Sequence, residues 1–184
     1  MTTDTLTTTK WVLDTTHSEV HFKVKHLMIS TVTGQFNTFE GTLETEDDDF
    51  TTAKAFFSAD VNSISTNNEQ RDQHLKNIDF FDIENHPHLT FESEKTVRVD
   101  DENYKVYGDM TLRGITKSIE LDAELGGTTV DPWGNTRVGF SLKGIINRKD
   151  FNVSFGLLTD AGGIALSDEV KLLVNVQFVK QKDN

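Results

Sequence analysis

The chain has 184 residues and a formal net charge of −12 at pH 7. This charge argues against binding to the phosphate backbone of nucleic acids, which needs a basic patch, and an anionic membrane would repel the chain as well. No apolar run reaches the roughly 20 residues of a membrane helix, so stable membrane insertion is not expected. The absence of cysteine excludes disulfides, thiolate metal ligands and a cysteine nucleophile.

The composition, with 35% hydrophobic and 26% charged residues, is typical of a globular protein. A chain of this length suits one domain, because a single core can bury well over half of the surface that the unfolded chain exposes. The N-terminal segment has neither the basic nor the apolar region of a signal peptide, so a cytoplasmic location is expected for the chain as given. We predict a disordered tail over residues 1–9, one domain over 10–180 and a C-terminal tail over 181–184.

A long strand pattern, from residue 17 onward, is the first predicted element. Val20, Phe22 and Val24 alternate with polar residues, which is the period of two of a strand with one buried face. The same inward parity continues through His26 and Met28. A histidine on an otherwise apolar face is either a satisfied core residue or part of a site.

Similar alternation recurs along the chain between segments rich in glycine, asparagine and aspartate, which favour turns. Together with the first pattern, these segments make about eight expected strands. The further segments are Phe39–Leu43, Ala53–Val61, Leu89–Phe91, Tyr104–Leu112, Ile119–Leu125, Val138–Ile146 and Val170–Phe178.

One segment, residues 68–81, has apolar residues at helical spacing instead. We predict a single short helix there, with the stripe formed by Leu75, Ile78 and Phe81 lying against the sheet or over one end of it. The candidate N-caps are Ser65, Thr66 and Asn67.

About eight antiparallel strands with one wet face each form either a sandwich of two sheets or a closed barrel, and closure leaves no free edge. An interior bounded by eight strands is either filled by side chains or holds one small ligand. Small inward residues such as Gly108, Ala123 and Gly144 occur beside Phe57 and Phe140. They either leave room for a guest or alternate with large residues to fit the taper of a barrel.

Four motifs occur in order along the chain. They are Trp11-Val12-Leu13-Asp14 with the alternating segment up to Gly34-Gln35-Phe36, Arg71–Leu75 with Asp79–Asp82, Gly108–Lys117, and Arg148-Lys149-Asp150-Phe151. In this order they resemble the YceI-like proteins, also called the lipid- or polyisoprenoid-binding family. The resemblance covers nearly the whole chain, from about Trp11 to Val179.

The resemblance implies an all-β, lipocalin-like antiparallel barrel with an elongated apolar cavity, often paired as a homodimer. It implies a bound long-chain lipid as ligand and no other cofactor. The chain departs from the family pattern in two ways. The sequence as given shows no export signal, whereas many members carry one that directs them to the periplasm. Asn152 occupies a position where the family usually has glycine.

Inward parity near strand ends selects the residues expected to meet such a ligand. His26 and Arg148 are the head-group candidates, since the rigid fork of an arginine suits phosphate or carboxylate. In a purely structural alternative, His26 makes a satisfied hydrogen bond and Arg148 pairs with Asp79, Asp82 or Asp150. The full set of expected ligand-binding residues is Phe22, Val24, His26, Met28, Phe57, Phe91, Met110, Phe140, Leu142, Ile146 and Arg148.

The histidine spacings do not predict a metal site. His17 and His21 lie about 13 Å apart on a strand and cannot share one ion. His86 and His88 lie about 6.6 Å apart on an extended segment, so a metal there stays an open alternative. Arg71 and Asp72 are expected to anchor the helix rather than to form a site.

No phosphate-binding loop, dinucleotide fingerprint or nucleophile elbow occurs in the sequence. The inward parity of the strands and the family resemblance together predict a non-catalytic carrier for a long apolar amphiphile: a polyisoprenoid, a polyprenyl phosphate, an isoprenoid quinone, or a fatty acid or amide. Two alternatives stay open: an enzyme acting on an isoprenoid lipid, and a filled barrel that serves as an interaction module in a stress response.

Overall fold

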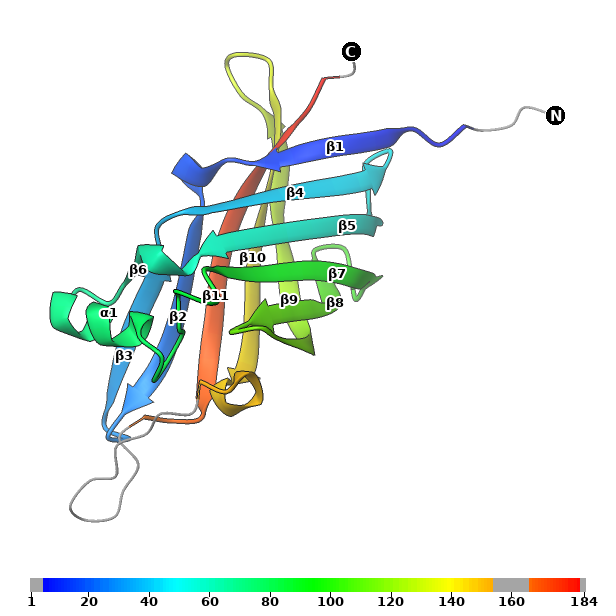
Figure 1. Ribbon diagram of the computed structural model, residues 1–184. Helices are drawn as coiled ribbons and strands as arrows, with labels where there is room; N and C mark the ends of the chain where they lie inside the picture. Colours follow the sequence, from blue (N-terminus) through cyan, green and yellow to red (C-terminus); the bar gives the residue numbers. More distant parts are fainter. Residues whose placement is uncertain (1–4, 154–165, 183–184) are drawn as a thin grey trace.

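The computed structural model describes residues 5–153 and 166–182, which form one antiparallel sheet with a single α-helix among them. Eight strands close into a barrel in the order β1-β4-β5-β7-β8-β9-β10-β11, with β11 returning to β1 (Figure 1). The predicted all-β barrel of eight antiparallel strands is therefore confirmed. These strands are β1 (Thr8–Leu13), β4 (Phe39–Glu46), β5 (Asp49–Asp60), β7 (His88–Arg98), β8 (Asn103–Leu112), β9 (Ile115–Val130), β10 (Thr136–Asn147) and β11 (Glu169–Lys180).

Three further strands, β2 (Glu19–His26), β3 (Ser30–Phe36) and β6 (Ile64–Ser65), lengthen the wall on one side. This is possible because β11 pairs with β1 near its C-terminal end, at Phe178–Lys180, and with β2 along Lys171–Asn175. β1 and β2 thus lie end to end along one edge of β11. β3 pairs with β2, and β6 pairs with β3.

The long first strand expected from the sequence is a hairpin. β2 ends at His26, the chain reverses over Leu27–Ile29, and β3 returns with Ser30 opposite His26. The reversal lacks the Asn-Gly or Asp-Gly signal that favours a tight hairpin turn, so the local sequence did not predict it. The inward parity expected through Met28 consequently stops before that residue.

The start of the domain also differs from the expectation. β1 begins at Thr8, and Thr9 is buried, so the last residues of the expected tail belong to the sheet. Residues 1–4 and 183–184 of the expected tails lie outside the described residues.

The predicted helix is present but shorter than expected. α1 spans Glu69–Lys76, and its N-cap is Asn68, whose side chain accepts a hydrogen bond from the backbone N–H of Arg71 at 2.9 Å. The helix ends where Asn77 Oδ1 accepts from the backbone N–H of Asp79, a local bond that competes with helical pairing. Three 3₁₀ turns accompany it: η1 (Thr15–His17), η2 (Val61–Ser63) and η3 (Arg148–Phe151).

The early end of α1 changes which residues face the barrel. Leu75 and Phe81 pack against the core as predicted, but Ile78 is 67% exposed. Phe80, which is 5% exposed, is buried instead. Within the described ranges, no helix is both long enough and apolar enough to cross a membrane.

Arg71 and Asp72 anchor the helix, as predicted, and both act through Thr66. Arg71 Nε donates to Thr66 Oγ1 at 2.7 Å, and the same hydroxyl donates to Asp72 Oδ1 at 2.6 Å. Because Thr66 directly follows β6, these bonds tie α1 to the lengthened side of the barrel.

Two inward glycines make room for aromatic rings. The ring of Phe22 lies over Gly34, its partner across β2 and β3. A Cβ at Gly108 would lie 2.6 Å from Phe91 Cζ and 2.5 Å from the carbonyl oxygen of Glu92. At these two positions, the space left by the missing side chain is filled by a neighbouring aromatic ring and is not available to a ligand.

We expect Gly108→Ala to lower the free energy of unfolding by about 2 kcal/mol, because the added methyl group meets backbone that cannot move aside cheaply. Gly139→Ala in β10 is the matched control, since its Cβ would meet the nearest atom at 3.9 Å. Urea denaturation of both variants measures the difference. Equal stabilities of the two would contradict the close packing at Gly108.

A cluster of charges on the outer face of the barrel links β10 and β11 to Asp14 and to the turn between β9 and β10. Arg137 in β10 donates to Asp14 Oδ2 at 2.6 Å and to Asp131 Oδ2 at 2.8 Å, and it also binds Gln177 in β11. Hydrogen bonds from Arg137 and the Asn135 backbone lower the pKa of Asp131 to about 2. Burial raises the pKa of Asp14, but hydrogen bonds, among them those from Thr16 and Arg137, outweigh this effect and lower it.

These lowered pKa values make the barrel sensitive to acid. Below pH 3.8, the ordinary value, the unfolded chain binds protons that folded Asp131 does not take up until about pH 2. We therefore expect the free energy of unfolding to fall as the pH drops through this range. Arg137→Gln should show a shallower fall in urea denaturation at a series of pH values, and an unchanged slope would show that other carboxylates dominate.

Candidate functional site

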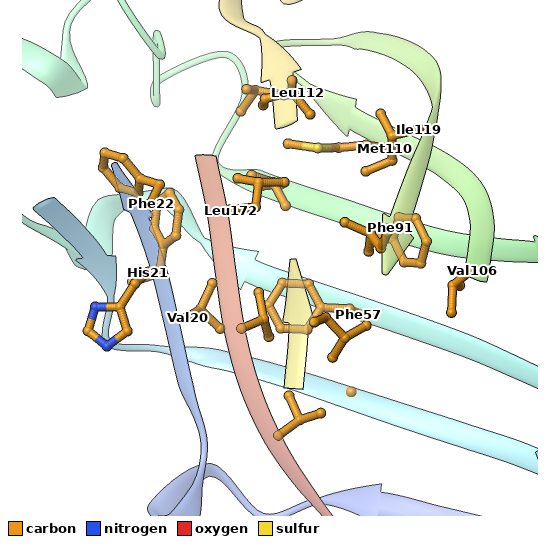
Figure 2. A pocket seen from close by; sticks show the side chains of 18 of the residues that line it. Val20, His21, Phe22, Phe57, Phe91, Val106, Met110, Leu112, Ile119 and Leu172 are labelled. Carbon is orange, nitrogen blue, oxygen red and sulfur yellow. The ribbon is translucent and has the colours of Figure 1, made fainter. Parts of the chain in front are cut away.

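The barrel encloses a cavity of about 260 Å³ whose wall is almost entirely apolar. Strands from all sides contribute to it, and the helical segment adds Leu75, Phe80 and Phe81. Figure 2 shows Phe57, Phe91 and other apolar side chains converging on this space. Among the described lining residues, His21, Thr96, Tyr104 and Arg148 are the ones with polar side chains.

Nine of the eleven residues expected to meet a ligand lie in this wall. The alternation of each strand therefore located the interior correctly, and their contact with a ligand stays a prediction. They are Phe22, Val24, Phe57, Phe91, Met110, Phe140, Leu142, Ile146 and Arg148.

The other two, His26 and Met28, are not among the lining residues, and both are exposed. His26 is the last residue of β2, and Met28 lies in the turn with a φ of 60° and 61% of its surface exposed. The cavity wall ends at Val24 on this strand, so His26 at the end of β2 and Met28 in the turn both lie beyond it. His21 contributes to the wall, but its imidazole points away from the apolar side chains in Figure 2 and lies 3.2 Å from Glu19 Oε2.

Arg148 is a buried charged residue in the cavity wall, with 5% of its surface exposed. β10 ends one residue earlier, so the side chain projects from the start of η3. Its Nε donates to the carbonyl of Ser167 at 2.9 Å, and its Nη1 donates to the carbonyl of Val153 at 2.7 Å. A third bond, from Nη2, reaches the carbonyl of Leu166 at 3.4 Å.

The ion pair of Arg148 differs from the expected ones. Its Nη2 lies 3.8 Å from Asp168 Oδ1, and the same oxygen lies 3.3 Å from Lys149 Nζ. Burial lowers the pKa of Arg148, and the charge of Asp168 partly opposes this shift. Of the partners expected from the sequence, Asp79 lies beside His74 and Asp82 accepts from Asn85. Long-range pairing brings Asp168 here, and no local spacing indicated it.

The backbone conformation at Asn152 explains why the family usually has glycine there. Asn152 has a φ of 58° and ends η3, with its backbone N–H bonded to the carbonyls of Arg148 and Lys149. Glycine adopts this left-handed conformation without strain, and asparagine is among the few other residues that tolerate it. The departure therefore leaves the backbone turn intact and keeps Arg148 and Phe151 buried.

The histidine pairs gain no further support as metal ligands. The imidazole of His86 packs over Gly114, where a Cβ would lie 2.7 Å from its Cε1, and His17 Nδ1 lies 2.8 Å from Asp14 Oδ2. In the described part of the chain, no three histidine or acidic side chains are grouped as a metal ion would require.

The match to known proteins extends over nearly the whole barrel, since the family model of the YceI-like domain matches residues 11–178. The chain belongs to the YceI-like family. The resemblance found in the four motifs is thereby confirmed. A UPF0312 protein of Pectobacterium carotovorum is 40% identical, and the match covers 90% of this chain and 83% of that protein. A UPF0312 protein of Staphylococcus aureus is 37% identical over 92% of this chain and 97% of its own length.

Two solved structures share the fold of this chain. The Campylobacter jejuni YceI protein superposes with a TM-score of 0.74 at 34% identity, covering 86% of this chain and 90% of that one. A polyisoprenoid-binding domain from Saccharophagus degradans superposes with a TM-score of 0.68 at 16% identity, covering 93% and 98%. The second likeness shows the fold alone.

Proposed function

We propose that this YceI-like protein is a non-catalytic binding protein that holds the chain of a long apolar amphiphile inside its barrel. The observation that carries the proposal is the apolar wall of the cavity, which comes from nearly every strand. Such a wall excludes water and offers no polar partner along most of its length, so a hydrocarbon chain is the guest that it suits.

The size of the cavity supports a single narrow chain. Its volume of about 260 Å³ is slightly below the roughly 300–1,000 Å³ of typical small-molecule sites. Each methylene group moved from water into the cavity contributes about 0.8 kcal/mol, so even a chain of modest length binds favourably. The candidates are a polyisoprenoid, a polyprenyl phosphate, an isoprenoid quinone, and a fatty acid or amide. The Saccharophagus domain described as polyisoprenoid-binding supports the first of these at the level of the fold.

Arg148 is the group best placed to meet an anionic head group. Among the described lining residues, Arg148 is the one with a permanently charged side chain, and it lies at the end of the cavity wall where β10 stops. Its bonds to the carbonyls of Ser167 and Val153 also give it a structural role, since they fix the backbone that follows η3 and precedes β11. We propose no reaction, because the arginine is engaged by these carbonyls and the imidazole of His21 points away from the apolar side chains of the cavity.

We expect lipid to co-purify with the gently isolated protein and to be released for mass spectrometry. Ala55→Phe, which places a ring into the cavity from β5, should reduce the amount of bound lipid at least about tenfold, because the loss of a few methylene contacts suffices for this change. Lys54→Phe is the control, since it adds the same ring to the exposed face of the same strand. Preparations without lipid, or equal loads in both variants, would contradict the proposal.

The role of Arg148 is tested by Arg148→Met, which keeps the length of the side chain and removes its charge. If the guanidinium binds a head group, the affinity for an anionic lipid should fall by about tenfold more than that for a neutral lipid of equal chain length. Titration of both lipids into the delipidated variant and wild type measures this ratio. Equal losses would assign Arg148 to the structure alone.

A further inference from the structure

The turn between β2 and β3 presents three consecutive apolar side chains to solvent. Leu27, Met28 and Ile29 are 41%, 61% and 85% exposed. Single exposed apolar residues are common and need no explanation, but a contiguous group at the tip of a hairpin is a feature of interaction surfaces. We call these three residues the apolar tip.

Neither turn chemistry nor burial accounts for the apolar tip. Leu27 and Met28 have φ values of 53° and 60°, in the left-handed region that glycine and asparagine adopt most easily. Two bulky residues therefore occupy positions where an Asn-Gly turn would be less strained. Since the apolar tip is also not buried in the chain, its composition points to a contact outside the molecule.

The paired segments of β2 and β3 that carry the apolar tip contain lysines but no carboxylates, although the protein as a whole is acidic. Residues 20–39 contain neither aspartate nor glutamate, whereas the whole chain contains 30. Lys23 on β2 lies directly opposite Lys171 on β11, and such like-charge pairs oppose sheet formation. Lys25 follows on β2. We call these three lysines the basic face.

We propose that the apolar tip and the basic face together form a docking surface for an anionic lipid bilayer. The three apolar side chains enter the boundary between head groups and acyl chains, and the lysines meet the lipid phosphates. The net charge of −12 does not prevent this contact. At physiological ionic strength, charges farther than about 8 Å are largely screened, so the local lysines decide the interaction.

The position of the docking surface suits a lipid-binding barrel. The cavity wall reaches Val24, three residues before the apolar tip, and Leu166, whose backbone bridges to His26. A bilayer that receives the apolar tip therefore lies close to this end of the cavity. In Figure 1 the β2–β3 turn lies at the opposite end of the molecule from the β9–β10 turn, where Trp133 is exposed beside the carboxylate of Asp131. The docking surface itself does not depend on the proposed function. Its role in lipid uptake does rest on that function.

Sedimentation with vesicles tests the docking. Wild-type protein should bind vesicles of equal parts phosphatidylglycerol and phosphatidylcholine, and should bind pure phosphatidylcholine at least about tenfold more weakly. The variant Leu27→Asn/Met28→Gly/Ile29→Ser should lose at least about 100-fold in affinity for the mixed vesicles, because it removes the apolar contact. Its melting temperature should not fall, since Asn-Gly suits the turn. Trp133→Ser, which removes an exposed ring at the other end, should bind like wild type.

The basic face is tested separately by Lys25→Gln/Lys171→Gln. Each lysine near an anionic surface contributes enough affinity that this variant should bind the mixed vesicles about 30-fold more weakly than wild type. Lys10→Gln/Lys117→Gln removes the same charge from exposed positions outside the basic face and should have little effect.

Several outcomes would overturn the proposal: no vesicle binding by wild type, equal binding of both vesicle types, or unchanged binding of the tip variant. Failure of all vesicle binding would leave an acidic protein or a second copy of this chain as the occupant, and sedimentation of the protein alone reports the latter. Ala55→Phe should still bind vesicles, because the docking surface does not include the cavity. If this variant loses vesicle binding, the association reflects lipid uptake, and the docking surface is refuted while the proposed function stands.

Discussion

The pairing of β11 with both β1 and β2 is the contact on which the rest of the structure depends. It closes the barrel between the last strand and the first, and it supports β2, to which β3 and β6 are added in turn. Closure satisfies the backbone hydrogen bonds of both edges, so the inward side chains are enclosed without any polar edge facing them. An apolar cavity within the wall is a consequence of this closure and not of any single residue.

A buried arginine in such an interior is costly unless its donors are bonded. Arg148 meets this condition through the carbonyls of Val153, Leu166 and Ser167, with Asp168 nearby. The same residue thus completes the wall near the start of β11 and carries positive charge into an apolar space. These two roles are compatible, because the bonds to carbonyls leave the net charge of the guanidinium intact.

The distribution of charge matters more here than its sum. An acidic surface favours solubility and discourages contacts with nucleic acids. On β2 and β11, Lys23 and Lys171 face each other beside a hairpin tip that is apolar and has left-handed backbone at Leu27 and Met28. A net charge of −12 therefore describes the average surface but not this part of it.

The alternation of apolar and polar residues was sufficient to predict the strands, their inward faces and nine of the residues in the cavity wall, because burial on one face leaves a period of two in the sequence. The four motifs were sufficient to predict the family and its barrel. The tertiary structure alone decided where β2 reverses, since Leu27 and Met28 carry no turn signal, and it removed His26 and Met28 from the wall. It also decided that Arg148 meets Asp168 and the carbonyls beside it. Local periodicity records which side of a strand is buried, whereas these partners are brought together by pairing between strands far apart in the chain.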